Sequence, residues 1–258
     1  LLATVDDAGQ LDAIDTLQRS RRIDGLVIVL PLATSLNQRR LTFSHVPTVH
    51  VDLQYDLDVN GISVDNFRGA YKAAEHLIEL GHRRIGIITG RRDIPVGQTR
   101  LDGFRAALND YGLPFDESLV AHGDFSHASG IAGAEQLLKL DPRPTAIFAC
   151  DDQMAFGAIH ALRRAGLEVP RDCSVIGFDD TYDAARFSPP LTTIRQPLRE
   201  MGELAGDLIC RLIDGKPLEQ PRIVLDTELV VRESTAPLLA ELPQQSAPVS
   251  IEARGEAA

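Results

Sequence analysis

The sequence predicts an α/β protein in which parallel strands alternate with helices. Its short strand-like runs are apolar along their whole length, as expected of parallel strands that are covered on both faces. Between these runs, apolar residues recur every three or four positions, which is the period of an amphipathic helix. This alternation predicts a doubly wound, mostly parallel sheet flanked by helices. The strand-like runs span residues 23–31, 47–52, 83–90, 144–150 and 173–180.

The clearest helical patterns lie after the second strand-like run and near the end of the chain. Apolar residues repeat at helical spacing across residues 66–80, and Gly81 follows as a candidate C-terminal cap. Residues 198–213 show the same periodicity and are followed by Gly215. Both segments are therefore predicted to be helices that pack one face against a sheet.

Length and composition restrict the class of protein. A chain of 258 residues with 44% hydrophobic residues can form one large α/β domain or two smaller lobes, and both remain open at this point. The formal charge of -11 argues against a nucleic-acid surface within this segment, because such surfaces need Lys and Arg to neutralise phosphates. The three cysteines, Cys150, Cys173 and Cys210, are widely spaced and are expected to be free thiols in a reducing compartment.

Both ends of the chain differ from its middle. The first residues, LLATVDD, resemble a strand without a preceding start signal, so we expect that the chain lacks its own beginning. Residues 237–258 are rich in Pro, Gln, Ala, Ser and Glu and are expected to form a flexible tail. No secretory signal opens the chain, and no apolar run approaches the roughly 18 residues that a membrane span requires. We therefore expect a cytoplasmic protein without membrane contact.

Paired acids follow two of the predicted strands. Asp179 and Asp180 end the run VIGFDD, and the carboxyl ends of parallel strands are where open sheets bind ligands. An ionised carboxylate only accepts hydrogen bonds, so it suits a ligand with several hydroxyl groups. We assign the ligand-facing role to Asp179. For Asp151 and Asp152, we assign the helix cap to Asp152 and the ligand contact to Asp151.

Two further side chains are candidates for the same site. Arg100 is predicted to lie in the first turn of a helix, where a cation is unfavourable, so it should face an acid or a ligand. Pairing with Asp102 or another acid is the alternative. Phe125 lies in a polar loop, where its ring could stack on a sugar or simply pack in the core. The chain lacks metal-ligand spacing, phosphate and dinucleotide loops and a nucleophile motif, so we expect neither a cofactor nor catalysis.

Several motifs together resemble the effector-binding domain of the LacI/GalR family of bacterial transcriptional regulators. The resemblance covers about residues 1–236, and its specificity comes from the combination of motifs. They span residues 21–29 (RRIDGLVIV), 63–90, 99–108 (TRLDGFRAAL), 151–180 and 188–197 (SPPLTTIRQP).

The resemblance implies a two-lobed, periplasmic-binding-protein-like fold in which the chain crosses between the lobes three times. Lobe one would comprise residues 1–80 and 196–218, without its first strand and helix, and lobe two residues 81–195 and 219–236. The helix-turn-helix domain that reads operator DNA in this family is absent from the sequence, so DNA binding would require that missing part. The family also implies a homodimer, with residues 153–165 and 182–187 on its surface.

The resemblance further implies a small sugar-like or nucleoside-like effector that is clamped between the lobes and controls a repressor allosterically. A periplasmic sugar-binding protein of a transport system is the alternative, and a sugar-modifying enzyme is a third class. The implied effector contacts are Arg100, Phe125, Asp151 and Asp179, together with Ile94, Val96, Leu198 and Asp65.

Overall fold

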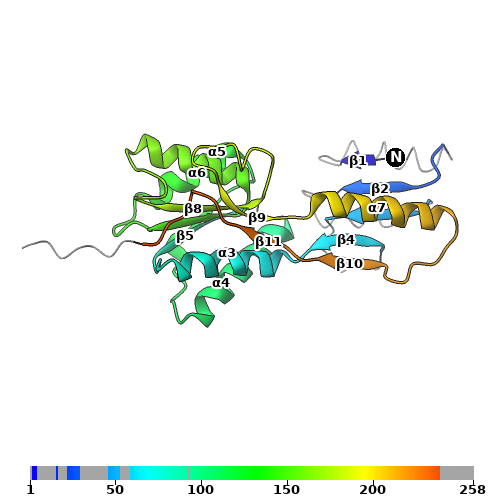
Figure 1. Cartoon of the computed structure of the whole chain (residues 1–258), viewed down its shortest axis with the longest axis horizontal. Coiled ribbons are helices and arrows are strands. Elements are labelled where there is room, and N and C mark those ends of the chain that lie inside the picture. The colour runs from blue at the N-terminus through cyan, green and yellow to red at the C-terminus, as the bar shows by residue number, and fades with distance from the viewer. Residues whose placement is uncertain are drawn as a thin grey trace, which may run out of the picture.

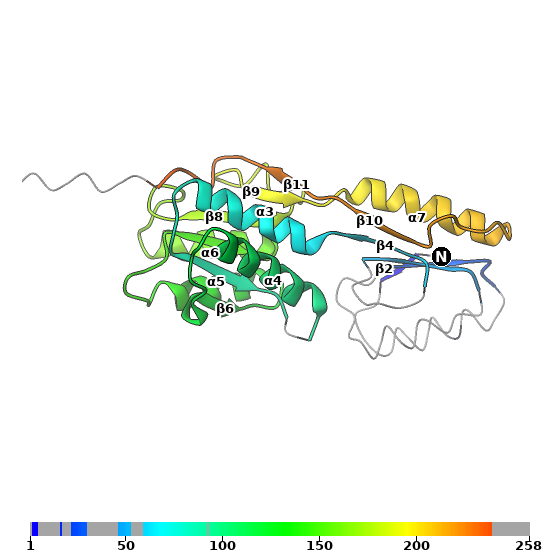
Figure 2. The same ribbon diagram turned by 90° about the horizontal axis from the view of Figure 1, so that it is seen from below.

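The protein consists of two lobes, each built on its own sheet (Figures 1 and 2). The structure is a computed structural model that describes residues 2–4, 16, 22–29, 46–52, 59–91 and 93–238. Lobe one has a parallel sheet, and helix α7 covers one of its faces. The strand order is β1 (Leu2–Thr4), β2 (Leu26–Val29), β3 (Thr48–Val51), β4 (Gly61–Val64) and β10 (Arg222–Leu225), and α7 spans Leu198–Ile213.

Lobe two is a doubly wound α/β body, as the sequence predicts. In its sheet only β11 runs antiparallel, against β9. Helices α3 and α4 lie on one side of the sheet, and α5 and α6 lie on the other (Figure 1). The strand order is β11 (Glu228–Val230), β9 (Thr192–Arg195), β8 (Ser174–Asp179), β7 (Ala146–Ala149), β5 (Ile85–Thr89) and β6 (Val120–His122). The helices are α3 (Asn66–Glu79), α4 (Pro95–Asp110), α5 (His127–Leu137) and α6 (Asp152–Arg164), with a 3₁₀ turn at Glu117–Leu119.

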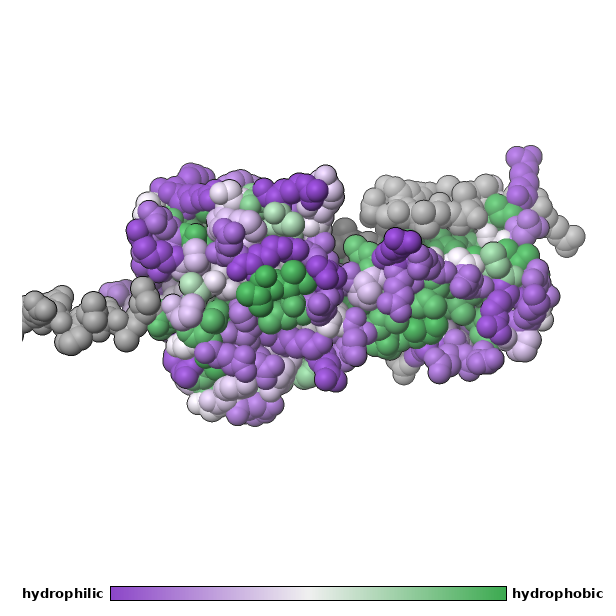
Figure 3. All heavy atoms as spheres, in the orientation of Figure 1, coloured by the Kyte–Doolittle hydropathy of each residue, from purple (hydrophilic) through white to green (hydrophobic). Residues whose placement is uncertain are grey.

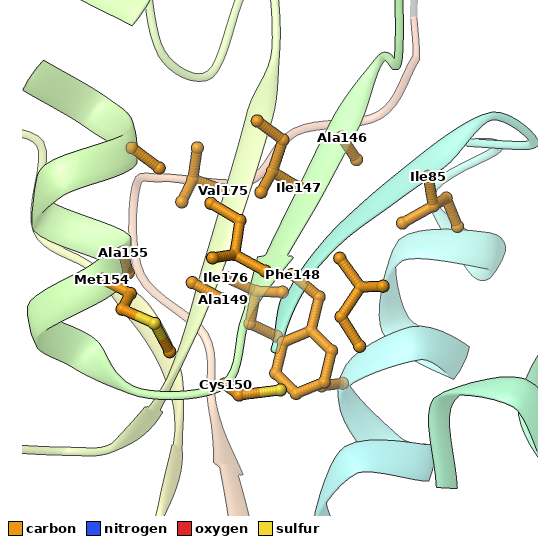
Figure 4. Packing of buried hydrophobic residues seen from close by; sticks show 14 of the residues in the cluster. Ile85, Ala146, Ile147, Phe148, Ala149, Cys150, Met154, Ala155, Val175 and Ile176 are labelled. Carbon is orange, nitrogen blue, oxygen red and sulfur yellow. The ribbon is translucent and has the colours of Figure 1, made fainter. Parts of the chain in front are cut away.

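The central strands of lobe two are buried on both faces. Figure 4 shows Ile147 and Phe148 of β7 beside Val175 and Ile176 of β8, with Met154 of α6 close to them. All of these side chains are fully buried. Two-sided burial explains why these strands are continuous apolar runs in the sequence.

The chain crosses between the lobes three times, between β4 and α3, between β9 and α7, and between β10 and β11. Two of these crossings differ from the expected boundaries. Helix α3 was expected in lobe one, but its apolar face, including Ala70, Ala74 and Leu77, belongs to the lobe-two core. Strand β10 was expected in lobe two, but it pairs with β4 in lobe one, with Arg222 opposite Gly61. Amphipathic periodicity reveals a packing face but does not reveal which sheet that face covers.

Helix ends follow the local sequence signals. Gly81 adopts a positive φ of 93° and its N–H donates to the Ile78 carbonyl, which confirms the predicted cap of α3. Most of the predicted flexible tail, residues 239–258, lies outside the described residues. In the described part of the chain, none of the helices has the length and apolarity needed to span a bilayer.

Candidate ligand-binding site

A cavity of about 400 Å³, here called the interlobe cavity, is lined by residues of both lobes. Lobe two contributes the ends of α4, β7 and β8 and the loop before α5. Lobe one contributes β2, β3 and the start of α7. The lining residues among those described are Val29, Val51, Asp52, Val96, Arg100, Phe125, Asp151, Asp179, Thr181, Gln196, Leu198 and Met201.

Arg100 is the buried cation of this cavity, with 4% of its surface exposed. Its Nε donates to Asn66 Oδ1 at 2.8 Å, and its Nη1 donates to the Cys150 carbonyl. Its Nη2 lies 3.6 Å from Asp179 Oδ1, and the guanidinium stacks over the Phe178 ring at 3.6 Å. These contacts hold the group in place, and the two hydrogen bonds engage two of its five N–H donors among the described residues. Arg100 is therefore oriented before any ligand arrives.

One expectation about Arg100 was wrong. Helix α4 begins at Pro95, so Arg100 lies in its second turn and not in its first. Of the acids considered as partners, Asp102 accepts from Gln98 and pairs with Arg105, and the acid that lies beside Arg100 is Asp179. The side chain turns instead toward the carboxyl ends of β7 and β8.

Asp179 faces the cavity at the end of β8, and Asp180 turns away from it. Asp179 Oδ1 accepts from Gln196 Nε2 at 2.6 Å. Burial raises the pKa of Asp179 to about 6, and Asp52 adds to this rise, whereas Arg100 and the bond from Gln196 oppose it. This carboxyl therefore changes charge near neutral pH.

Asp151 has the cavity-facing role assigned to it, but it also takes the capping role that was assigned to Asp152. Asp151 caps α6 by accepting from the Met154 N–H at 2.7 Å, and it also lines the cavity. Asp152, predicted to be the cap, is fully buried and accepts from the Thr181 N–H and Oγ1 and from Thr193 Oγ1. Burial raises the pKa of both carboxyls to about 7, with a further contribution from the charge of Asp179.

Phe125 combines the two roles that the sequence left open. Its ring lines the cavity and also packs against the lobe-two core. The ring lies directly on Gly90, where an added Cβ would come within 1.9 Å of Phe125 Cζ. The absence of a side chain at position 90 is thus what lets the ring reach this place.

Comparisons with known proteins agree with this architecture. Residues 74–235 match the periplasmic binding protein-like domain. The HTH-type transcriptional regulator CelR of Thermobifida fusca is 42% identical over 176 residues, which cover 68% of this chain and 52% of CelR. The solved CelR–cellobiose complex superposes with a TM-score of 0.84 at 35% identity, over 91% of this chain and 72% of that one. A LacI-family regulator from Enterococcus faecium with bound ribose superposes with a TM-score of 0.80 at 30% identity. The match covers 89% of this chain and 85% of that one.

The chain belongs to the LacI family. It has the two-lobed, periplasmic-binding-protein-like fold of the effector domains of these transcriptional regulators. The chain spans 52% to 66% of the length of the first curated relatives that it matches.

The other positions suggested by the family resemblance divide into two groups. Val96 and Leu198 line the cavity of this LacI-family domain. Asp65 and Ile94 are not among its lining residues. The Asp65 carboxylate accepts from the Arg68 N–H and caps α3, and the Ile94 side chain is buried at the start of α4.

Three polar lining residues were not identified from the sequence. Asp52 follows the predicted strand that ends at residue 52, so the rule that selected Asp179 could have selected it as well. Thr181 directly follows the Asp179–Asp180 pair. Gln196 lies in a crossing, and nothing in its local sequence marks it as part of a cavity.

Backbone strain is concentrated at this site. Among the described residues, the non-glycine positions with positive φ are Asp52 at 61°, Phe125 at 69°, Asp179 at 116° and Asp180 at 56°. The first three line the cavity, and the fourth adjoins it. Such conformations cost free energy and persist where the surrounding structure enforces them, often at binding sites.

The chemistry of the cavity suits a ligand with polar edges and apolar faces. Three carboxyls, those of Asp52, Asp151 and Asp179, face one guanidinium, and the remaining wall is largely aliphatic or aromatic. No group of three or more His, Cys, Asp or Glu side chains that could hold a metal ion lies within the described ranges.

A larger groove of about 810 Å³ lies in lobe one between β2, β3 and α7. Its wall is mainly aliphatic and glycine, and its charged members, Arg22 and Asp24, lie at the exposed start of β2. Binding sites are distinguished by convergent polar groups in an apolar wall, and this groove lacks them among the described residues. We therefore place the ligand site in the interlobe cavity.

Proposed function

We propose that this chain is the ligand-sensing core of a LacI-type transcriptional repressor that binds an uncharged, sugar-like effector in the interlobe cavity. The observation that carries the proposal is the convergence of Arg100, Asp151, Asp179 and Phe125 on one cavity from separate elements. Carboxylates accept from sugar hydroxyls, the guanidinium donates to sugar oxygens, and the ring covers an apolar sugar face. Solved relatives that hold cellobiose and ribose support this ligand class.

The charge balance of the cavity narrows the ligand class. With one guanidinium against three carboxyls, an anionic group such as a phosphate would meet net repulsion inside a poorly solvated space. A neutral sugar or nucleoside encounters no such cost. The charge balance therefore favours uncharged effectors over sugar phosphates.

Because the cavity draws on both lobes, a ligand that contacts both walls favours the lobe arrangement in which both contacts form. Only a difference in ligand affinity between the two lobe arrangements can shift the equilibrium between them. In the full-length cytoplasmic protein, the lobe shift would act on an operator-binding domain that lies outside this chain. We propose no catalytic step, since the relatives are regulators.

A homodimer would carry the lobe shift to two DNA-binding domains. On α6 and the segment after β8, Phe156 stacks on Phe187 with ring centroids 4.4 Å apart. Tyr182 nearby is 74% exposed. Exposed aromatic side chains beside an ordered aromatic pair suit a protein–protein surface.

The test is a thermal-shift screen followed by calorimetry. D-ribose, D-glucose and cellobiose are each compared with the matching sugar phosphates, because a ligand that binds the folded state raises the melting temperature. We expect at least one neutral sugar to bind and its phosphate to bind more weakly. Tighter binding of the phosphates, or turnover of the sugar, would overturn the proposal.

A further inference from the structure

Asp180, the residue after the cavity-facing Asp179, makes contacts of a different kind. Its Oδ2 accepts from Arg195 Nε at 2.7 Å, and its Oδ1 accepts from Arg232 Nη2 at 2.6 Å. The carboxylate is largely buried, with 9% of the side chain exposed. One acid therefore binds two arginines, and charge-assisted bonds of this length are among the stronger ones in proteins.

The two arginines lie at opposite ends of the paired strands β9 and β11, and one of them adjoins a crossing between the lobes. Arg195 is the last residue of β9, immediately before the crossing that leads to α7. Arg232 lies two residues beyond the end of β11, the strand that begins at the third crossing, and its N–H donates to Thr192 Oγ1 at the start of β9, so Asp180 holds β11 through its far end. Glu228, the first residue of β11, accepts from Arg195 Nη1 at 2.9 Å and so joins the two crossings directly.

Asp179 holds the same crossing from the cavity side. Gln196, the first residue beyond β9, donates from Nε2 to Asp179 Oδ1 and from its backbone N–H to the Asp179 carbonyl at 3.3 Å. The end of β8 thus holds one crossing through two adjacent acids. Asp179 faces the cavity, and Asp180 faces the crossing strands.

We propose that Asp180 is a positioning residue that fixes the lobe-two ends of the second and third crossings, so that the lobes bend at Gln196–Pro197 and Asp226–Thr227. A ligand that binds Asp179 would then act, through Gln196, on a crossing whose lobe-two end is already fixed. The link to a ligand rests on the proposed function. The anchoring of the crossings does not, because it concerns contacts within this chain.

The backbone at Asp180 makes asparagine the appropriate replacement. Its φ of 56° lies in the left-handed region, which Asn adopts more readily than most residues. Asp180→Asn keeps the shape and removes the charge that binds both arginines. The matched control is Asp116→Asn, which removes a carboxylate that pairs with Arg84 on lobe two, away from the crossings.

The first measurement needs no ligand. Amide hydrogen exchange of the unliganded protein should become at least about tenfold faster in Asp180→Asn at Arg195, Gln196 and residues 226–232, and not in β5 or β7. Asp116→Asn should leave these amides at wild-type rates. Unchanged exchange at both crossings in Asp180→Asn would overturn the proposal, whether or not any sugar binds.

The second measurement uses the neutral sugar selected by the thermal-shift screen. The wild type should become more compact in small-angle X-ray scattering when this sugar is added, and Asp180→Asn should lose most of that change and bind about 5- to 30-fold more weakly. A purely stabilising residue would lower the melting temperature without altering the compaction, and that result would count against the proposal. If Asp180→Asn does not fold, Arg195→Gln replaces it, since it releases one crossing and leaves the Asp180–Arg232 pair in place. Arg195→Gln should then speed amide exchange at positions 195 and 196, and wild-type rates at both would refute the anchoring.

Discussion

Asp179→Asn should weaken effector binding without lowering the stability of the fold. The Asp179 carboxylate is expected to accept at least one hydroxyl of the effector, and hydrogen bonds to charged groups contribute about 1.5 to 3 kcal/mol. At about 1.36 kcal/mol per factor of ten, the dissociation constant should rise roughly 12- to 160-fold. Asn is preferred to Ala because position 179 has a φ of 116°, at which a side chain without polar atoms would add strain.

The same substitution should not weaken the fold. Burial raises the pKa of Asp179 to about 6 from its ordinary value of 3.8, so the ionised form is disfavoured in the folded protein. A shift of this size corresponds to about 3 kcal/mol at pH 7, and a neutral Asn avoids that cost. We therefore expect a melting temperature at or above that of the wild type.

Isothermal titration calorimetry with the sugar found in the screen measures the binding change, and thermal unfolding measures stability. Asp102→Asn is the control, because Asp102 lies on the same helix as Arg100 but pairs with other residues. Wild-type affinity in Asp179→Asn, or equal loss of affinity in Asp102→Asn, would refute the reasoning.

Three other predictions concern the ring, pH-dependent binding and pH-dependent stability. Phe125→Ala should weaken sugar binding without unfolding the protein, as calorimetry and circular dichroism would show, and a variant that fails to fold would mean that Phe125 serves mainly the core. Sugar affinity should rise from pH 5 to pH 8, because the raised pKa values of Asp179 and Asp151 mean that the accepting carboxylates form only near neutral pH. Asp151→Asn should remove the part of this rise near pH 7. An affinity that does not change with pH in the wild type would contradict the prediction. Burial lowers the pKa of His50 from its ordinary value of 6.5 to about 4. As the pH falls below 6.5, the unfolded state therefore binds a proton more readily than the folded state and is favoured. Between pH 7 and pH 5 this costs about 2 kcal/mol, so chemical denaturation at the two pH values should show the wild type losing about 2 kcal/mol of stability relative to His50→Leu, and an unchanged difference would contradict this.

The sequence predicts best the elements that are buried most. Strands β5, β7 and β8 are apolar on both faces, and helices α3 and α7 carry long amphipathic patterns, so their period and type could be read directly. Strands β10 and β11 have only 4 and 3 residues and lie at sheet edges, where one side is exposed. So short a run has no measurable period, and its place depends on partners far away in the chain.

The candidate site shows the same division. Asp179 was identified because it ends a strand within one lobe, and a rule about parallel sheets applies to such ends. Arg100 was identified from an expected place in the first turn of a helix, which proved to be the second turn. Gln196 was not identified from the sequence, because it lies in a crossing and lines the cavity only through the arrangement of the two lobes. The cap of α6 was assigned to the wrong one of two neighbouring acids because the choice depends on which of them has the extended backbone that a cap requires, and φ at Asp151 is -154°.

The outer surface is hydrophilic over much of the face seen in Figure 3, with apolar patches on both lobes. Val224 on β10 and Val231 after β11 are more than half exposed. Both lie on the segments that join or follow the third crossing. Replacement of either valine by Ser would therefore alter the surface at this crossing without changing the walls of the cavity.

The way Arg100 is held has a consequence for how new ligand preferences could arise. Its supports are an amide side chain, a main-chain carbonyl and an aromatic face, all supplied by the protein itself. The opposite wall, with Val29, Val51 and Asp52, shares none of these supports. Substitutions there can reshape the pocket for another sugar while the cation keeps its orientation, so redesign of this sensor should begin at those three positions and leave the arginine untouched.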